Sequence, residues 1–90
     1  MADDRIDDVK EELRKFVVSN YLKGSKGYKL SDDDSFLKKA ILDSIGVIEL
    51  TAFIQKKYKV RVRVSEIVPE NFDTLNNLEK YIVLKLKEAA

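Results

Sequence analysis

Three segments of the chain place apolar side chains at the spacing of an amphipathic helix. The first predicts a helix over residues 3–21, with aspartate and glutamate gathered in its first turns, where the helix dipole favours negative charge. The second predicts a helix over residues 44–58, for which Asp43 is in position to be the N-cap. The third predicts a final helix with Asp73 or Thr74 as its cap. Its core stripe consists of Leu75, Leu78, Ile82 and Leu86.

A long polar loop is expected between the first two helices. Residues 23–36 contain two glycines and a cluster of polar side chains, a composition typical of loops. The apolar residues Leu30, Phe36 and Leu37 can pin this loop onto a core. Three consecutive aspartates, residues 32–34, offer oxygen ligands for a cation. Such a run in a loop is more often simply solvated, and we therefore predict no metal site there.

The segment that precedes the last helix is predicted to be mostly irregular. Residues 60–64 alternate apolar and basic side chains with the period of a strand. Because no second strand is available to pair with it, we predict an extended connector that buries Val60 and Val62. The sequence SEIVPE, residues 65–70, predicts a short helix that ends near Pro69.

The composition agrees with a small helical protein. Ninety residues favour a single domain, residues 1–90, with one modest core. Three glycines and one proline are few for an all-β fold with many tight turns. We therefore expect an all-α fold, a small bundle of three long helices plus one short helix, with a long loop between the first two long helices.

The residue types that are missing limit the chemistry. The chain contains no cysteine and no histidine, so it offers no disulfide, no thiolate metal ligand and no histidine base. Catalytic triads are thereby excluded, and we expect no metal ion. No apolar run approaches the length of a membrane span, and the acidic start MADDRIDD does not resemble a signal peptide. We expect a soluble, cytoplasmic protein without a membrane partner.

The helix expected over residues 44–58 is apolar on more than one side. Its natural core stripe consists of Val47, Leu50, Ile54 and Tyr58. A second apolar patch, on the side of Ser44 and beside Glu49, consists of Ile45, Ile48 and Ala52. A surface helix of a small bundle needs only one apolar stripe. Either this helix is central and packs on both sides, or the second patch is a docking surface for a partner.

Chemistry alone leaves several roles open for Ser44. A serine at the start of a helix is usually a cap. It cannot be the nucleophile of a triad, because the chain has no histidine to activate it. It could accept a phosphate-type group, whose negative charge would lie at the positive end of the helix dipole, near unpaired backbone N–H groups.

Several landmarks follow one another along the chain. The pair Asp43 and Ser44 opens the second helix in ILDSIGVIEL, and a large apolar residue and a Glu-Leu pair follow it. An aromatic residue and alternating apolar residues come next in FIQKKYKVRV, and a Phe and a Thr then precede the last helix in FDTLNNLEKYI. In this order and spacing, and over nearly the whole chain, the landmarks resemble the acyl carrier protein family, also called phosphopantetheine-binding or thiolation domains.

The resemblance implies that the Ser44 Oγ is esterified by 4′-phosphopantetheine from coenzyme A, whose thiol carries an acyl or aminoacyl group as a thioester. It implies a non-catalytic carrier that presents intermediates to enzymes of fatty acid, polyketide or related specialised biosynthesis; we expect a monomer. The implied partners are a phosphopantetheinyl transferase, whose recognition Asp43 would assist, and acyl-activating ligases or synthases. The surface that these partners contact would consist of Ile45, Ile48, Glu49, Ala52 and Lys56.

The chain departs from this family's pattern in two places. Gly46 stands where relatives often have Asp or Leu, and glycine costs about 1 kcal/mol of helix propensity relative to alanine. Residues 55–63, QKKYKVRVR, hold five bases and no acid, whereas relatives in bacterial fatty acid synthesis typically have an acidic helix. These departures suggest the hypothesis of a specialised carrier that serves a dedicated pathway or a standalone ligase.

Two other functions stay open from the sequence. The first is a helical protein-interaction domain without a prosthetic group. The second is a small nucleic-acid binder that uses Lys56, Lys57, Lys59, Arg61 and Arg63. The net charge of +1 and the acidic first helix argue against this second function, and we expect no nucleic-acid partner.

Overall fold

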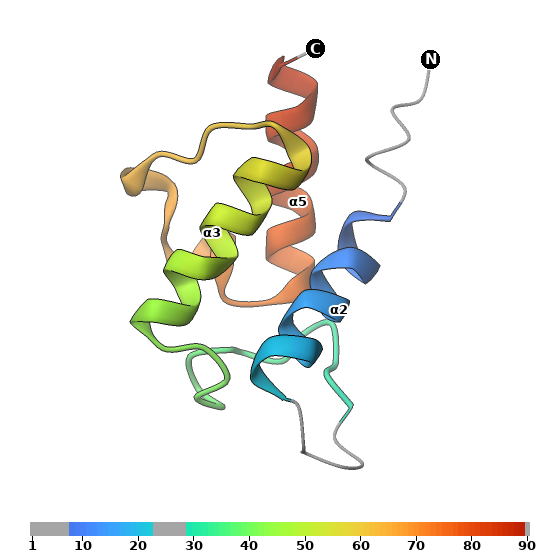
Figure 1. The fold of residues 1–90 in the computed structure, drawn as a ribbon, viewed down its shortest axis with the longest axis vertical. Coiled ribbons are helices and arrows are strands. Elements are labelled where there is room, and N and C mark those ends of the chain that lie inside the picture. Colours follow the sequence, from blue (N-terminus) through green and yellow to red (C-terminus); the bar gives the residue numbers. More distant parts are fainter. Residues whose placement is uncertain (1–7, 23–28, 90) are drawn as a thin grey trace.

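The structure is a computed structural model that describes residues 8–22 and 29–89. Within these ranges all regular structure is helical and no strand is present, which confirms the expected all-α class. Figure 1 shows the elements, which are α2 (Val9–Tyr21), α3 (Ser44–Tyr58), the 3₁₀ turn η1 (Val64–Glu66), α4 (Pro69–Phe72) and α5 (Leu75–Ala89). No helix in the described ranges combines the length and the apolar character needed to cross a membrane.

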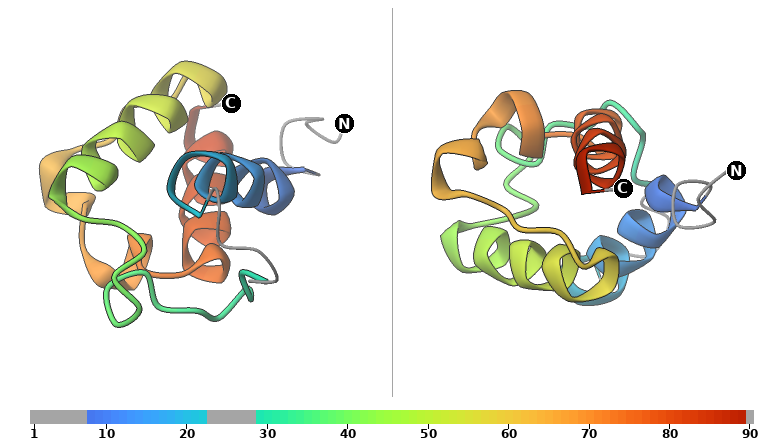
Figure 2. Two further views of the ribbon diagram at one scale, coloured as in Figure 1. Left: turned by 60° about the horizontal axis from the view of Figure 1, so that its bottom comes forward. Right: turned by 90° about the horizontal axis from the view of Figure 1, so that it is seen from above.

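The three long helices enclose one core. Helix α5 packs against both α2 and α4, and α2 also contacts α3. Seen from above, the long helices and the segment that carries η1 and α4 surround a common centre (Figure 2). The side chains with no exposed surface come from every long helix and include Leu13, Leu50, Ile54, Leu78 and Ile82. Burying a leucine or isoleucine side chain stabilises a fold by about 1.5–3 kcal/mol, so this centre is the main source of stability.

Helix α5 carries the core stripe that its spacing predicts, whereas α3 buries three residues of its predicted stripe and leaves the fourth, Val47, half-buried. Helix α3 begins and ends where the sequence indicates, and α5 buries all four residues of its stripe. The cap of α5 is Thr74, whose Oγ1 accepts the backbone N–H of Asn77 at 3.0 Å. Helix α2 begins at Val9, and residues 3–7 of the helix predicted there lie outside the described residues.

Asp73, the alternative cap, instead attaches the long loop to α4. Its carboxylate accepts the Ser35 hydroxyl at 2.6 Å and the Leu37 backbone N–H at 2.9 Å. Its backbone carbonyl accepts the Phe36 N–H at 2.8 Å. These three hydrogen bonds form one wall of the site described below.

The long loop is pinned to the core by two of its three predicted anchors. Leu30 and Phe36 are buried, but Leu37 is 71% exposed, so the prediction for Leu37 was wrong. The backbone turns at residues 36–40, and because the N–H groups of both Phe36 and Leu37 bond to Asp73, only the first of the two side chains reaches the core. Leu37 is left on the surface.

The three aspartates of the loop are engaged by protein groups. Asp32 forms ion pairs with Lys10 and Arg14 of α2, and together these hold the pKa of Asp32 below its ordinary value, chiefly through the hydrogen bond from Arg14. Asp33 accepts the side-chain amide of Asn76. Within the described ranges no group of three or more acidic side chains is arranged to hold a metal ion.

The segment after α3 differs from the prediction at Pro69. The expected short helix was to end near this proline, but the chain instead forms the turn η1 and then begins α4 at Pro69. A proline is tolerated in the first position of a helix because the missing N–H would have no acceptor there. The connector itself buries Val60 as predicted, whereas Val62 is only half-buried.

Candidate functional site

The site is built around the start of α3, where Asp43 caps the helix and Ser44 does not. The Asp43 backbone is extended and its Oδ1 accepts the Gly46 N–H at 2.7 Å, so Asp43 is the N-cap, as the sequence predicts. Ser44 is the first residue of the helix and its side chain is exposed. The cap interpretation of Ser44 is therefore wrong, and its hydroxyl is available for another role.

Gly46 explains how the start of α3 fits against α2. The residue is buried, and a Cβ added to it would lie 3.2 Å from Leu42 Cδ2, 3.3 Å from Asp43 Oδ1 and 3.4 Å from Tyr21 Cε1. The first two distances are shorter than ordinary van der Waals contact and the third is ordinary, so a side chain would press on Leu42 and on the capping carboxylate of Asp43. The loss of helix propensity at Gly46 is thus offset by close packing.

Tyr21 links the end of α2 to the outer side of α3. Its hydroxyl donates to Glu49 Oε1 at 2.5 Å. Burial, followed by this hydrogen bond, raises the pKa of Tyr21 to about 12. Behind it, the rings of Phe16 and Phe53 stack with their centroids 4.3 Å apart. The one acidic side chain on this side of α3 is therefore held in place by α2.

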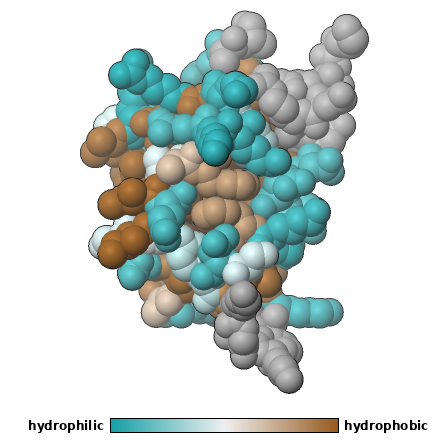
Figure 3. All heavy atoms as spheres, viewed as in Figure 1, coloured by the Kyte–Doolittle hydropathy of each residue, from teal (hydrophilic) through white to brown (hydrophobic). Residues whose placement is uncertain are grey.

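The second apolar patch of α3 lies on the surface. Ile45 is 65% exposed and Ile48 is 67% exposed, while Ala52, Glu49 and Lys56 are exposed as well. The alternative in which α3 packs on both sides is therefore wrong. We call the surface formed by Ser44, Ile45, Ile48, Glu49, Ala52 and Lys56 the outer face of α3. Figure 3 shows hydrophobic atoms along the left edge of the molecule, where α3 begins and η1 lies.

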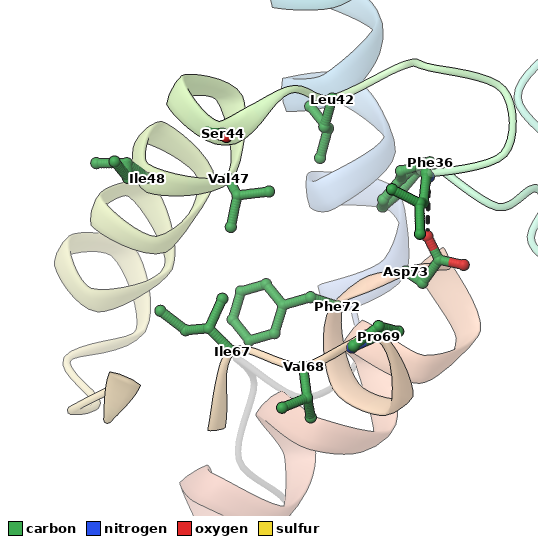
Figure 4. A pocket seen from close by; sticks show the side chains of 11 residues that line it. Phe36, Leu42, Ser44, Val47, Ile48, Ile67, Val68, Pro69, Phe72 and Asp73 are labelled. Carbon is green, nitrogen blue, oxygen red and sulfur yellow. Dashed lines mark hydrogen bonds between the residues drawn. The ribbon is translucent and has the colours of Figure 1, made fainter. Parts of the chain in front are cut away.

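An apolar cavity of about 430 Å³ opens beside Ser44. It lies between the first turns of α3 and the segment that leads from η1 into α4, and Figure 4 shows Val47, Ile67 and Phe72 directed into the same space. Leu42 and Phe36 close it toward the long loop. No local pattern in the sequence predicts this cavity, because its walls come from three segments that meet only in the folded chain.

Glu66 fixes the wall of the cavity that η1 provides. Its carboxylate accepts the Arg63 backbone N–H at 2.9 Å, the Tyr81 hydroxyl at 2.9 Å and the Lys85 Nζ at 3.2 Å. These donors, the Arg63 N–H foremost, lower the pKa of Glu66 below its ordinary value. Ile67, the next residue in the chain, lines the cavity. Sequence reasoning missed Glu66, because two of its partners lie on α5, far along the chain.

The basic segment after residue 55 is mostly on the surface. Lys57 forms an ion pair with Glu12 of α2 at 3.6 Å. The other four bases, Lys56, Lys59, Arg61 and Arg63, are exposed. Lys59 ends α3 in the left-handed conformation, with φ 57°.

Comparison with known proteins identifies a family. A family model described as the phosphopantetheine attachment site matches residues 27–82, which is more than half of the 90-residue chain. The matched span includes the whole of α3, with Ser44 at its start, and every segment that lines the cavity. No curated protein matches the sequence.

Proposed function

The chain belongs to the phosphopantetheine attachment-site family, and we propose that it is a carrier protein whose prosthetic group is attached at Ser44. Domains of this family carry 4′-phosphopantetheine covalently. The group supplies a terminal thiol, which this cysteine-free chain lacks, on which an acyl or aminoacyl cargo is held as a thioester. The observation that carries the proposal is an exposed serine hydroxyl at a helix start, released from capping and placed at the mouth of an apolar cavity.

The residues around Ser44 fit a phosphodiester. The first N–H groups of α3 have no acceptor within the helix, and the positive end of the helix dipole favours a negative group there. Asp43 uses one of its oxygens for the Gly46 N–H and is exposed, so a transferase can contact it. We propose that Asp43 positions the start of α3 and assists recognition by a phosphopantetheinyl transferase.

The cavity favours a cargo with an apolar chain. Of the side chains that point into it, Val47, Ile67 and Phe72 carry no polar atom. Its volume of about 430 Å³ lies within the range of small-molecule pockets, about 300–1,000 Å³. An acyl chain would gain from burial against this mostly apolar lining, whereas a charged aminoacyl group would lose hydration and find only Ser44 and Asp73 as polar lining residues. We therefore favour acyl over aminoacyl cargo.

The outer face of α3 is the surface that we propose for partner enzymes. Its exposed isoleucines lie within about one turn of Ser44 and Ala52 extends the same surface along the helix, so an enzyme that binds there has the attachment point at the edge of its contact. Carrier domains generally do no catalysis of their own, and this chain has neither histidine nor cysteine for it. It would act as a tether, raising the effective concentration of its cargo for successive enzymes such as a ligase or synthase.

One experiment decides the attachment proposal. The protein is incubated with coenzyme A and a broad-specificity phosphopantetheinyl transferase and then weighed by mass spectrometry. We expect a gain of one phosphopantetheine in the wild type and in the matched control Ser65→Ala, which removes another exposed serine hydroxyl. We expect no gain in Ser44→Ala. Absence of any gain with every transferase tried would leave the plain interaction domain as the better interpretation.

The pathway is a separate proposal. The five bases of residues 55–63 and the single acid of the outer face support a specialised carrier rather than one of housekeeping fatty acid synthesis. The test is to supply the loaded protein to a housekeeping fatty acid synthase in vitro and measure elongation. Elongation as efficient as that with an acidic carrier would refute the specialised assignment while leaving the attachment site intact.

A further inference from the structure

Four basic side chains form a continuous exposed strip at the end of α3 and along the connector that follows it. Lys56, Lys59, Arg61 and Arg63 are exposed, and no ion pair joins any of them to an acid of the described ranges. We call this strip the cationic ridge. In the view of Figure 3, hydrophilic atoms cover the segment after α3, above the hydrophobic edge.

Three acids of the neighbouring elements are bound to groups that are not part of the ridge. Glu12 pairs with Lys57, which is not part of the ridge. Glu49 accepts the Tyr21 hydroxyl, and Glu66 accepts three donors, among them the Lys85 ammonium. Within the described ranges these three acids are bound to groups outside the ridge, and the four ridge cations face solvent. Their complement is a negative surface on another molecule.

The backbone at Lys59 is a second observation that points to a role for its charge. Lys59 ends α3 with φ 57°, a left-handed conformation that is unfavourable for any residue with a Cβ and that usually selects glycine at this position. Lys59 places a cation at the end of the helix, but its backbone conformation is less stable than that of a glycine in the same position. Strained positions of this kind are concentrated at functional surfaces.

The ridge is continuous with the outer face of α3. Ile48, Ala52 and Lys56 are spaced by four residues and so lie along one side of the helix. At a rise of about 1.5 Å per residue, Lys56 is about 18 Å from Ser44 along the axis, within the span of one protein interface of about 800 Å² per partner. An apolar centre bordered by charge is the usual anatomy of such interfaces.

We propose that the cationic ridge is the charged border of the outer face and binds an acidic protein surface on the enzymes that act on the carried group. This inference rests on the proposed carrier function. A protein partner is favoured because the ridge lies on the same helix as the face proposed for partner enzymes, and the net charge of only +1 argues against a nucleic acid or an anionic lipid surface. The ridge would steer association and select against enzymes with basic docking surfaces.

The test uses two synthetic helical peptides that share a leucine face. One has glutamates on both borders of that face, and its twin has lysines at the same positions. Binding of each labelled peptide to the loaded protein is measured at low and at high salt, and the contact is mapped by amide chemical shifts. We expect the glutamate peptide to bind at low salt, to weaken as salt rises, and to shift the signals of α3 and the connector, while the lysine peptide does not bind.

Paired variants separate charge from structure. Lys56→Glu/Arg61→Glu should reverse the preference for the two peptides, whereas the control Lys80→Glu/Lys87→Glu, with the same change of net charge on exposed α5 positions, should not. Lys59→Gly should raise stability yet weaken binding by about two- to fivefold, the loss of one surface ion pair. Its control is Ala40→Gly, which relieves another left-handed residue, with φ 53°, and should leave binding unchanged.

The outcomes that overturn the inference are distinct from those that overturn the carrier function. Equal binding of the two peptides, shifts that fall away from the ridge, or an unchanged preference in Lys56→Glu/Arg61→Glu would refute it. The proposed acidic protein partner would also be refuted if a single-stranded oligonucleotide or phosphatidylglycerol vesicles bound more tightly than the glutamate peptide. Salt-sensitive self-association would refute it in favour of a second copy of the chain. Loading of Ser44 is measured on each variant, so a failed carrier function shows as no loading in any of them.

Discussion

The hydrogen bond between Gly46 and Asp43 allows the structural role of Asp43 to be separated from its role in recognition. Two substitutions at position 43 distinguish capping from recognition. Asp43→Ala removes both the acceptor for the Gly46 N–H and the negative charge at the start of α3. Asp43→Asn keeps an acceptor oxygen and removes only the charge, because Asn and Asp are about equally good N-caps.

The expected magnitudes follow from the geometry of the cap. Replacing an N-cap aspartate by alanine costs typically about 1 kcal/mol, and the interaction of an exposed carboxylate with the helix dipole contributes about 0.3–1 kcal/mol. In a domain of this size, 1 kcal/mol lowers Tm by about 4–8 °C. Asp43→Ala loses both contributions, about 1.3–2 kcal/mol, and we expect it to lower Tm by about 5–16 °C. Asp43→Asn loses only the second contribution and should lower Tm by at most about half as much.

The assay is thermal and urea unfolding followed by circular dichroism, with the rate of phosphopantetheine loading measured on the same samples. If the transferase recognises the charge of Asp43, the asparagine variant is nearly as stable as the wild type but is loaded more slowly. An asparagine variant destabilised as much as the alanine variant, or an alanine variant with unchanged stability, would refute the assignment of Asp43 as the cap of α3.

Further predictions concern the core and the titrating groups. Ile54→Ala, in the core, should lower the free energy of unfolding by about 2–5 kcal/mol, whereas Ile48→Ala, on the outer face, should change it by less than about 0.5 kcal/mol. Equal changes in the free energy of unfolding for the two variants, measured by urea titration, would contradict this prediction. Burial is the main cause that raises the pKa values of Tyr21 and Tyr58 to about 12. The stability that these two tyrosines contribute should therefore be fully present below pH 10.0 and be lost as the pH rises toward 12. Tyrosinate absorbance that rises only together with loss of helix would support this prediction, and full ionisation near pH 10.0 in the folded state would contradict it. Because the pKa of Glu66 is lowered, the stability that its carboxylate contributes should be present above the ordinary glutamate pKa and be lost as the pH falls through the lowered pKa. Glu66→Gln should therefore make the free energy of unfolding, measured with urea, depend less on pH on the acid side. An unchanged pH dependence on the acid side would count against the hydrogen bonds assigned to Glu66.

The sequence predicts those parts of the fold that depend on local spacing. The bounds of α3 are recovered because Asp43, a cap, directly precedes a periodic apolar run. The stripe of α5 is recovered for the same reason. The exposure of Ile45 and Ile48 was one of two alternatives, because helical spacing shows which residues share a side of a helix but not what lies against that side.

Some features missed from the sequence depend on contacts between residues that are distant in the chain. Others depend on a residue type that is compatible with two different local structures. Pro69 was expected to end a helix and instead begins one, since proline is compatible with the first turn but not with the interior. Leu37 is exposed because Asp73, remote in the sequence, fixes the backbone of the turn. The cavity beside Ser44 follows from the way α4 is held away from α3, which no local pattern records.

The close packing around Gly46 has a consequence for engineering and for divergence. A leucine or aspartate at this position, as relatives often have, would require Leu42 and the Asp43 carboxylate to shift by a few tenths of an ångström, with the Tyr21 ring already at contact distance. A graft of a foreign α3 onto this scaffold would therefore fit better with a smaller residue at position 21. Because that change would also release Glu49, positions 21, 46 and 49 should be exchanged as a set in chimeric carriers.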